Sequence, residues 1–244
     1  MAAAEDDTAA LRDVPKAALL AWGVTSGTTK GPKPRWTLEQ ILDTAARLAD
    51  AEGVTAITMT GIAEELGSAT MSLYRYVESR EDLVVLTADR ALGPGYALDG
   101  DTWDDRLRAW VRDLRAAYER HPWLATLPVG TEPLLPSYVR RLEAGLECLG
   151  PLGLPSERAI TVLTMLWTYT RGDVEQTEHL ASSMDNSSNA TIGQRLADRL
   201  RAVNSGHQLP RVLAALEETP LQTDQSEFEA AIDVIITGLR RTAQ

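Results

Sequence analysis

The sequence predicts an all-α protein, in which a three-helix N-terminal helix-turn-helix domain precedes a larger α-helical domain. Apolar residues recur at three- and four-residue spacing in most segments, and no stretch of useful length alternates between apolar and polar residues as a half-buried strand would. Gly and Pro punctuate the chain between these segments, as at Gly53 and Gly67. We therefore expect three parts: a flexible extension over residues 1–35, the helix-turn-helix domain over 36–82 and the larger domain over 83–244.

Composition excludes several classes of protein. No apolar run reaches the roughly 18 residues that a membrane-spanning helix needs, and the opening residues MAAAEDDTAA carry acids where a secretory signal would carry bases. Cys148 is the only cysteine, and the three histidines do not stand at metal-binding spacing, so we expect neither a metal nor another cofactor. A cytoplasmic location without a membrane partner is the resulting expectation.

The net charge of −11 argues at first against a nucleic-acid partner, because a basic surface is the usual signature of such proteins. Net charge, however, does not describe where the charges lie. One short stretch, KGPKPR at residues 30–35, is basic without an acidic residue. It is either a solvated tether or an extended arm whose Lys33 and Arg35 lie in a DNA minor groove, where the negative potential attracts such side chains.

Residues 36–82 carry the signals of short helices around one core. Thr37 and Gln40 form a capping-box pair at the start of the first helix, and Gly53 is placed to end it. Thr58 is the expected cap of the second helix. Apolar residues recur with helical spacing in both helices: Leu38, Ile41, Leu42, Ala45, Leu48 and Ala49 in the first, and Met59, Ile62, Ala63 and Leu66 in the second.

A tight turn at Gly67 leads to the third helix, which we expect to open near Ser68 and to carry residues 71–76. Leu73 and Val77 point into the core of this arrangement, and the polar side chains around them face outward. A helix this short cannot bury itself, so its exposed face must meet a partner. Small hydroxyls, two tyrosines and one arginine suit the bases and phosphates of a DNA groove, which makes double-stranded DNA the expected partner.

The stretch AEELGSATMSLYRYVESREDLV, which follows a capped helix ending at Gly53, resembles the TetR family of transcriptional repressors. The family pattern is roughly A-x-x-L-G-V-S-x-x-x-L-Y-x-H-F/V-x-x-K-x-x-L. The positions that fit it directly are Ala63, Leu66, Gly67, Leu73, Tyr74, Val77 and Leu83. Arg80 replaces the family's lysine and keeps its charge, whereas Ser68, Ala69 and Tyr76 stand where Val, Ser and His are common. Because Ala69 cannot cap the third helix, Ser68 is the expected cap.

The resemblance covers about residues 37–90 and implies a ligand-responsive repressor that binds a near-palindromic DNA operator as a homodimer. Base edges would be contacted from the third helix, and phosphates by flanking tyrosines and arginine. The predicted DNA-binding residues are Lys33, Arg35, Thr60, Thr70, Met71, Ser72, Tyr74, Arg75, Tyr76 and Arg80. Three alternatives stay open: Tyr74 as a core aromatic, because it follows the buried Leu73, Met71 as ordinary surface, and Arg75 as an ordinary solvated charge.

Beyond the helix-turn-helix domain the whole chain has helical periodicity. We expect helices over residues 80–92, 103–118, 123–127, 136–149, 156–180, 192–203, 211–216 and 226–240. The resemblance implies that the helix over 80–92 links the DNA-binding domain to a ligand-binding domain. It also places the dimer surface on the helix over 156–180 and the last helix, although the apolar residues of the last helix also suit a monomer core.

Aromatic and polarisable side chains concentrate in the middle of the larger domain. The chain has six Trp and six Tyr but a single Phe, and aromatic residues that carry a polar atom suit a pocket for a flat, partly polar effector. The predicted ligand-binding residues are Trp110, Tyr118, Trp123, Tyr138, Met165, Trp167 and Tyr169. Each of these residues, taken singly, is more often part of a core than of a pocket.

Two other classes of function were weighed against this prediction. An enzyme is disfavoured, because the sequence has no Gly-rich phosphate loop, nucleophile elbow or metal-spaced His and Cys set, and we predict no catalytic residue. A helical protein-interaction module without specific DNA binding is favoured slightly by the acidic balance. The intact Leu-Tyr-Arg-Tyr face at residues 73–76 favours DNA.

Overall fold

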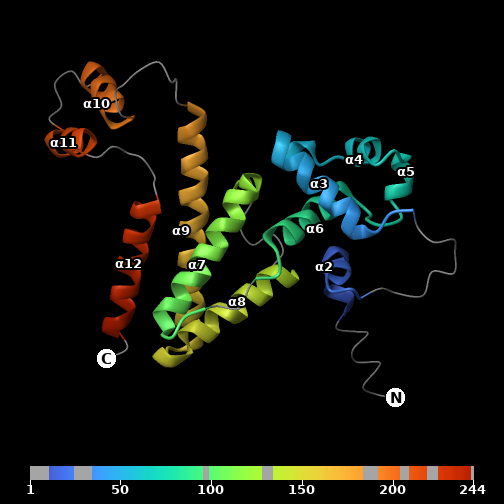
Figure 1. Cartoon of the computed structure of the whole chain (residues 1–244), viewed down its shortest axis with the longest axis horizontal. Helices are drawn as coiled ribbons and strands as arrows, with labels where there is room; N and C mark the ends of the chain where they lie inside the picture. Colours follow the sequence, from blue (N-terminus) through green and yellow to red (C-terminus); the bar gives the residue numbers. More distant parts are fainter. Residues whose placement is uncertain are drawn as a thin grey trace. The chain divides into compact units, whose positions relative to one another are not determined.

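The computed structural model describes residues 11–24, 35–95, 99–127, 134–183, 192–203, 209–218 and 225–242 (Figure 1). These residues form helices and no strand, which confirms the all-α prediction. The elements are η1 (Leu11–Asp13), α2 (Lys16–Ala21), α3 (Leu38–Glu52), η2 (Val54–Ala56), α4 (Met59–Glu65), α5 (Thr70–Leu73), α6 (Arg80–Leu92), α7 (Trp103–Arg120), η3 (Pro122–Thr126), α8 (Pro136–Leu149), η4 (Gly150–Leu152), α9 (Ser156–Ser183), α10 (Ile192–Val203), α11 (Pro210–Glu218) and α12 (Gln225–Thr242).

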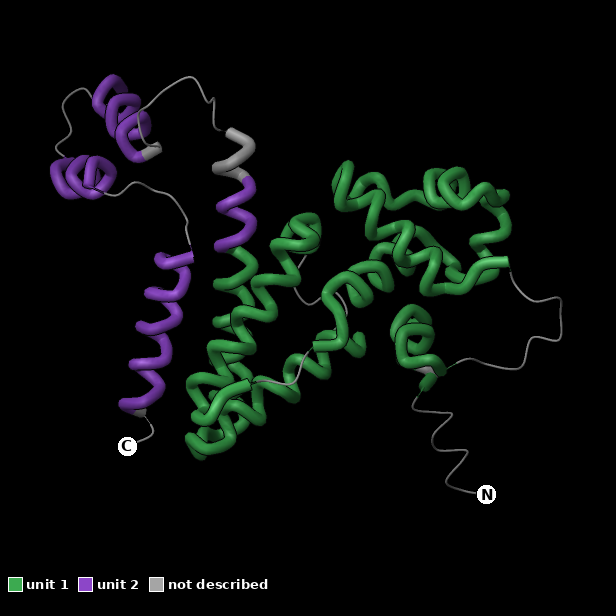
Figure 2. The backbone as a smooth tube through the Cα atoms, in the orientation of Figure 1, with its two compact units in different colours: residues 1–172, 243 green, residues 173–242, 244 purple. Residues whose placement is uncertain are grey.

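The chain divides into two compact units, residues 1–172 and residues 173–242, and the division falls within α9 (Figure 2). The first unit holds the helix-turn-helix segment together with α7, α8 and the first part of α9. The second holds the rest of α9 with α10, α11 and α12. Within the described residues, no helix is both long enough and apolar enough to cross a lipid bilayer.

The predicted caps of the helix-turn-helix segment are present. The Thr37 side chain accepts a hydrogen bond from the Gln40 amide at 3.2 Å, and the Gln40 side chain accepts one from the Thr37 amide at 2.9 Å. Thr58 caps α4 by accepting from the Gly61 amide at 3.0 Å. These bonds satisfy amides that a helix N-terminus leaves without an internal partner, so the sequence signals act locally as expected.

Gly67 makes the turn between α4 and α5. Its φ of +57° lies in the left-handed region that favours glycine. The Gly67 amide donates to the Glu64 carbonyl and the Ser68 amide donates to the Ala63 carbonyl, at 3.0 and 2.8 Å. This pair of bonds is a Schellman motif, which ends α4 and redirects the chain into α5.

The start of α5 differs from the prediction. Ala69 is the N-cap residue and provides no side-chain hydrogen bond, so the expectation that Ser68 caps this helix is wrong. The Ser68 hydroxyl lies instead 2.6 Å from the Ser72 hydroxyl. Only residues 70–73 form the α-helix, and the next residues continue as turns held by the Tyr76 and Val77 amides, which both donate to the Leu73 carbonyl.

The core of the helix-turn-helix segment consists of residues that the helical spacing selects. The side chains of Ile41, Ile62, Leu73 and Leu83 are each 0% exposed, and they come from α3, α4, α5 and α6 respectively. Burying a side chain of this size contributes about 1.5–3 kcal/mol each. This burial fixes α5 so that its remaining side chains face away from the core.

The part of residues 1–35 that the structure describes includes a folded helix. In α2, Ala17 and Ala18 are buried, and the helix packs against α6 (Figure 1). The predicted flexible extension therefore holds at least one element with tertiary contacts. Lys33, the other predicted arm residue besides Arg35, lies outside the described residues.

The larger predicted domain begins with a bundle in the first unit and continues in the second. In the first unit α7 packs along α8, and α8 approaches α9 closely at Gly145, where an added Cβ would lie 2.6 Å from the Leu163 side chain. In the second unit α10 packs against α11. The apolar side chains of α12 that are already buried within the single chain are Phe228, Ile232, Ile236 and Leu239.

Candidate nucleic-acid interface and effector cluster

The outer face of the α4–α5 pair carries most of the predicted base-reading residues. Met71 is 75% exposed and Tyr74 is 46% exposed, while Thr60 and Arg75 are also exposed. The alternative of Tyr74 as a core residue is therefore wrong. Because Leu73 anchors this short helix in the core, the exposed side chains are held at the surface beside the Gly67 turn.

Thr70 and Ser72, also predicted to reach bases, are half-buried. The Ser72 hydroxyl donates to the Ala69 carbonyl at 2.6 Å, so the bond between the two serine hydroxyls must be donated by Ser68, since a hydroxyl has one proton. This bond ties the Ser72 side chain to the carbonyl at the start of α5, but it is no N-cap, because a cap accepts from helix amides. A base contact from Ser72 would require this bond to rearrange.

Two residues predicted to hold phosphates make intramolecular bonds instead. The Tyr76 hydroxyl donates to the Trp36 carbonyl at 2.7 Å, and Tyr76 is half-buried. Arg80 donates from Nε to the Ile57 carbonyl at 2.8 Å and from Nη2 to the Val54 carbonyl at 3.2 Å. Both residues hold the helix-turn-helix segment together, and their phosphate contacts stay a prediction.

Arg35, the predicted end of the basic arm, lies beside the turn of the helix-turn-helix motif. Its Nη1 donates to the Gly67 carbonyl at 3.2 Å, and its guanidinium lies over the Trp36 ring, 5.5 Å from the ring centroid. The side chain remains exposed. The chain therefore enters α3 with a cation placed next to the α4–α5 turn.

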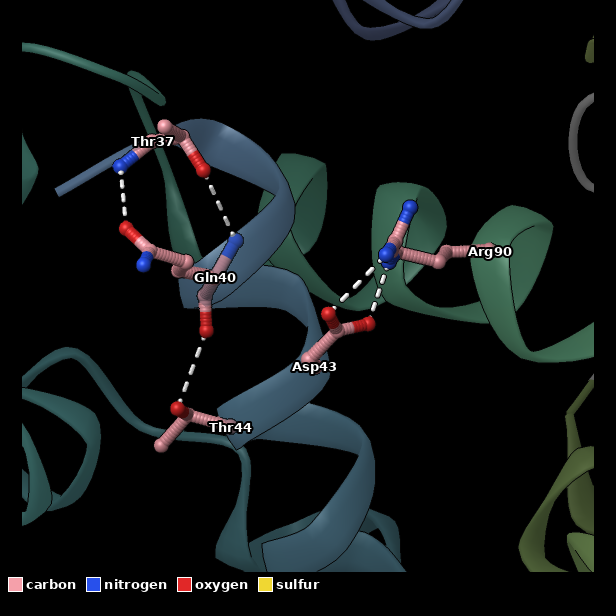
Figure 3. A network of polar contacts seen from close by, with 5 residues as sticks. All are labelled: Thr37, Gln40, Asp43, Thr44 and Arg90. Carbon is pink, nitrogen blue, oxygen red and sulfur yellow. Dashed lines mark hydrogen bonds and ion pairs between the residues drawn. The ribbon is translucent and has the colours of Figure 1, made fainter.

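An ion pair connects α3 to α6 (Figure 3). Arg90 of α6 donates to both carboxylate oxygens of Asp43, from Nε and from Nη2, the latter at 2.9 Å. The hydrogen bond to Asp43 raises the pKa of Arg90, which keeps the guanidinium charged. On α3, the helix of Asp43, the Thr44 hydroxyl donates to the Gln40 carbonyl at 2.9 Å. A bidentate pair of this kind fixes the orientation of the two helices more firmly than a single contact.

The opposite side of the last turn of α6 is bonded to α8. Asp89 accepts a hydrogen bond from the Ser137 amide at 2.8 Å, and so serves as a cap for α8 from another helix. The Leu92 carbonyl accepts from Nη2 of Arg141 at 2.7 Å. Arg141 is 2% exposed and also pairs through Nη1 with Asp113 of α7. These residues were not among the predicted site residues, because a charged residue on a helix is ordinarily solvated.

Four of the predicted ligand-binding residues form one cluster. The ring centroids of Trp110 and Trp167 are 6.0 Å apart in an edge-on arrangement, and those of Tyr138 and Trp167 are 5.0 Å apart. The Trp167 indole donates to the Tyr118 hydroxyl at 2.9 Å, and the Trp110 indole donates to the Arg141 carbonyl at 2.8 Å. Helices α7, α8 and α9 each contribute to this cluster.

Tyr118 supplies a hydrogen-bond donor in the cluster. Burial raises the pKa of Tyr118, while the hydrogen bond from Trp167 opposes that rise, so the hydroxyl is protonated at neutral pH. Because its oxygen accepts from Trp167, its own proton is available to another acceptor. Within the part of the chain that the structure describes, that proton has no acceptor.

The other three predicted ligand-binding residues do not join this cluster. Met165 and Tyr169 are four residues apart and share one face of α9, whereas Trp167 lies on the opposite face at about 100° per residue. Met165 is accordingly 47% exposed and Tyr169 is half-buried. Trp123 is buried, but its indole donates to Asp50 of α3 at 2.8 Å.

Trp123 belongs to a junction between η3 and the helix-turn-helix segment. The same Asp50 oxygen lies 2.8 Å from Nδ1 of His121, and the rings of His121 and Trp123 meet edge-on with centroids 6.4 Å apart. From the other side, Arg171 of α9 donates to the Ala125 carbonyl at 2.7 Å. Across the described residues, no group of three His, Cys, Asp or Glu side chains is placed to hold a metal ion.

Comparison with known protein families agrees with this geometry. Residues 41–86 match the family model described as bacterial regulatory proteins, tetR family, and residues 93–243 match the one described as tetracyclin repressor-like, C-terminal domain. The HTH-type transcriptional repressor DrrR1 of Streptomyces coeruleorubidus is 30% identical over 242 residues, which cover 97% of this chain and 89% of DrrR1. Tetracycline repressor protein class E of Escherichia coli is 27% identical over 144 residues, 57% of this chain and 68% of that protein.

Solved structures show the same fold. Apo ActR from Streptomyces coelicolor has 26% identity and a TM-score of 0.67, over 87% of this chain and 98% of ActR. ActR in complex with actinorhodin has 25% identity and a TM-score of 0.68, over 87% of this chain and 99% of ActR. The chain therefore belongs to the TetR family of bacterial regulatory proteins, and it is a ligand-responsive transcriptional repressor with a DNA-binding helix-turn-helix domain.

Proposed function

We propose that the exposed face of α5, with Thr60 from α4, reads the operator in the major groove. The observation that carries this proposal is the exposure of Met71 on α5 and of Tyr74 and Arg75 in the turns that follow it, next to the fully buried Leu73. In this proposal Arg75 makes the bidentate guanine contact that is the commonest specific contact of arginine. Tyr74 holds a phosphate and so fixes the register.

Arg35 supports a further contact from the N-terminal side. It lies beside Gly67, at the turn that precedes the reading helix. We assign it, with Lys33, to an arm that follows the adjacent minor groove. This arm supplies positive charge that an acidic chain otherwise lacks near the operator. Action on chromosomal DNA also supports a cytoplasmic location.

The proposed effector is a flat aromatic molecule with at least one carbonyl oxygen, bound at the cluster of Trp110, Tyr118, Tyr138 and Trp167. The ring contacts and the available Tyr118 proton support this chemistry. The related protein ActR has been solved with actinorhodin and with (S)-DNPA. Actinorhodin is therefore a reasonable probe compound, without being the assigned effector.

One helix-turn-helix motif reads too few base pairs for useful specificity, so the repressor is proposed to act as a homodimer on a near-palindrome. We assign the dimer surface to α9 and α12. Ile160 on α9 is 43% exposed and Val234 on α12 is 73% exposed, and exposed aliphatic side chains of this kind favour a helix–helix contact between subunits. The monomer-core alternative accounts for Phe228 and Ile232, which are buried already.

The proposed release mechanism is a population shift transmitted by α6. Asp89 and Leu92 bond α6 to α8, and Arg90 bonds it to α3, so a displacement of α8 must change the position of the helix-turn-helix segment. An effector that binds the displaced form more tightly lowers operator affinity by that difference in affinity and by no more.

Selection from random-sequence DNA duplexes with the full-length protein tests the DNA-binding part. The expected result is enrichment of one near-palindrome with half-site centres about 10 base pairs apart, bound by two protomers with steep salt dependence. Static light scattering tests the dimer: the wild type is expected as a dimer and Val234→Arg as a monomer. Failure to enrich any sequence would favour a protein-interaction module instead.

A further inference from the structure

Helix α2 contacts both the helix-turn-helix segment and the start of α8. On the first side, α2 packs against α6, and Ala18 of α2 is 0% exposed. Lys16 of α2 also pairs with Glu78 at 2.8 Å. On the second side, the Trp22 indole donates to the Leu134 carbonyl at 2.6 Å. Leu134 lies two residues before Pro136, the first residue of α8, so α2 bridges two regions that the chain itself connects only through α6 and α7.

The Trp22 ring makes a second contact with α8. The guanidinium of Arg140 lies over this ring, 5.8 Å from its centroid. A cation over the face of a tryptophan is attracted by the ring quadrupole. Trp22 is therefore held by an edge contact to a backbone carbonyl and a face contact to a side chain, although 44% of the residue is exposed.

A groove of about 400 Å³, open to solvent, lies beside the C-terminal end of α2. Its walls include Leu20 of α2, Leu42 of α3, Leu86 of α6 and Pro136 of α8. Because this groove is open to solvent, α2 does not close the junction completely. Both partners of the Lys16–Glu78 ion pair are also exposed, with side-chain exposures of 68% and 63%, and an exposed ion pair contributes little to stability. An element with few buried contacts opens locally more easily than a core helix.

We propose that α2 is an intramolecular brace across the junction of α6 and α8, and that Trp22 is its positioning residue. While α2 is docked, it limits the movement of α6 against α8 and so the range of positions that α5 occupies. A restrained reading helix loses less conformational freedom when it binds DNA, so docking of α2 raises operator affinity. The effect on DNA rests on the proposed operator binding, whereas the effect on the junction does not.

Hydrogen exchange of the full-length protein, followed by mass spectrometry, tests the brace without DNA. Trp22→Phe removes the indole donor, and Ala18→Glu places a charge in the contact with α6. Both variants are expected to exchange the Ser137 and Val139 amides at least fivefold faster, with the amides of α4 and α7 unchanged. Leu11→Ala, at an exposed position, is the control and is expected to behave as the wild type. Unchanged exchange at the start of α8 in both variants would overturn the brace.

A second measurement separates positioning from stability. Trp22→Phe is expected to weaken binding to the selected operator at least threefold while leaving the midpoint of urea unfolding unchanged. A shifted midpoint with unchanged operator affinity would overturn the positioning role. If no operator is found by selection, the proposed DNA binding fails, and the hydrogen-exchange result still decides whether α2 braces the junction.

Discussion

The buried guanidinium of Arg141 on α8 donates from Nη2 to the carbonyl oxygen of Leu92, the last residue of α6, across 2.7 Å. Its Nη1 pairs with Asp113 on α7, and its own carbonyl accepts from the Trp110 indole. One residue thus links the aromatic cluster to the end of the helix that leads to the DNA-binding segment. Its Nε is buried and has no hydrogen-bond partner among the residues that the structure describes, which adds a cost that the other bonds must offset.

Arg141→Met is expected to lower the free energy of unfolding by about 3–5 kcal/mol, because Asp113 would be left without its partner in a mostly buried site. Urea unfolding followed by circular dichroism measures this loss. The double variant Arg141→Met with Asp113→Leu removes both charges and is expected to regain most of the stability. A loss below about 1 kcal/mol in the single variant would show that the pair does not stabilise the junction.

Trp123→Phe is expected to lower the free energy of unfolding by about 1.5–3 kcal/mol, since the Asp50 carboxylate, a charged acceptor, loses the hydrogen bond that the Trp123 indole donates. Trp36→Phe is the matched control, because the Trp36 indole nitrogen is buried and has no hydrogen-bond partner among the described residues. Differential scanning calorimetry compares the two variants. Equal losses would mean that the contact between η3 and α3 contributes nothing beyond ring packing.

Tyr118→Phe is expected to weaken the binding of actinorhodin or a related probe compound about tenfold, because one hydrogen-bond donor to the ligand is lost. Operator affinity in the absence of the probe is expected to stay unchanged. Tyr169→Phe makes the same chemical change on the other face of α9 and serves as the control. Quenching of tryptophan fluorescence measures the affinity, and an equal effect of both variants would place the effector elsewhere.

Cys148 is expected to resist thiol reagents in the folded protein. Burial raises its pKa to about 11, so the thiol stays protonated and unreactive at neutral and mildly alkaline pH. Because the pKa of Cys148 is higher in the folded state, burial of the protonated thiol contributes fully to stability below the unfolded pKa of about 8.5. That contribution is lost as pH rises toward 11. Labelling by a thiol-reactive chromogenic reagent is expected to be at least about 100-fold slower than in the unfolded chain. Comparable rates would contradict burial of this side chain.

Local signals in the sequence predicted local structure well. The caps at Thr37 and Thr58 and the turn at Gly67 each depend on bonds within a few residues, so residue type and spacing were sufficient. The fold class and the buried positions of α3 to α6 followed from helical spacing in the same way. The missing cap at Ala69 was visible in the sequence, but the bond from the Ser72 hydroxyl to the Ala69 carbonyl depends on backbone geometry.

Contacts between distant segments were not predictable. Tyr76 and Arg80 were assigned to phosphates because nothing in the sequence shows that Trp36, Val54 and Ile57 offer them carbonyl acceptors. Composition identified the aromatic residues of the effector cluster. The three predicted ligand-binding residues that lie outside the cluster do so for different reasons. The helical period separates Met165 and Tyr169 from Trp167, whereas the Asp50 partner of Trp123 stands 73 residues away.

Operator binding by Arg75→Ala tests the central claim most directly. Fluorescence anisotropy with the selected duplex compares this variant with the wild type and with Arg120→Ala, which removes the same charge from an exposed position on α7. We expect Arg75→Ala to weaken binding by about 10- to 100-fold, corresponding to the 1–3 kcal/mol of a good arginine–guanine pair, and Arg120→Ala to bind as the wild type. Equal affinities of Arg75→Ala and the wild type would contradict the assignment of α5 as the reading helix.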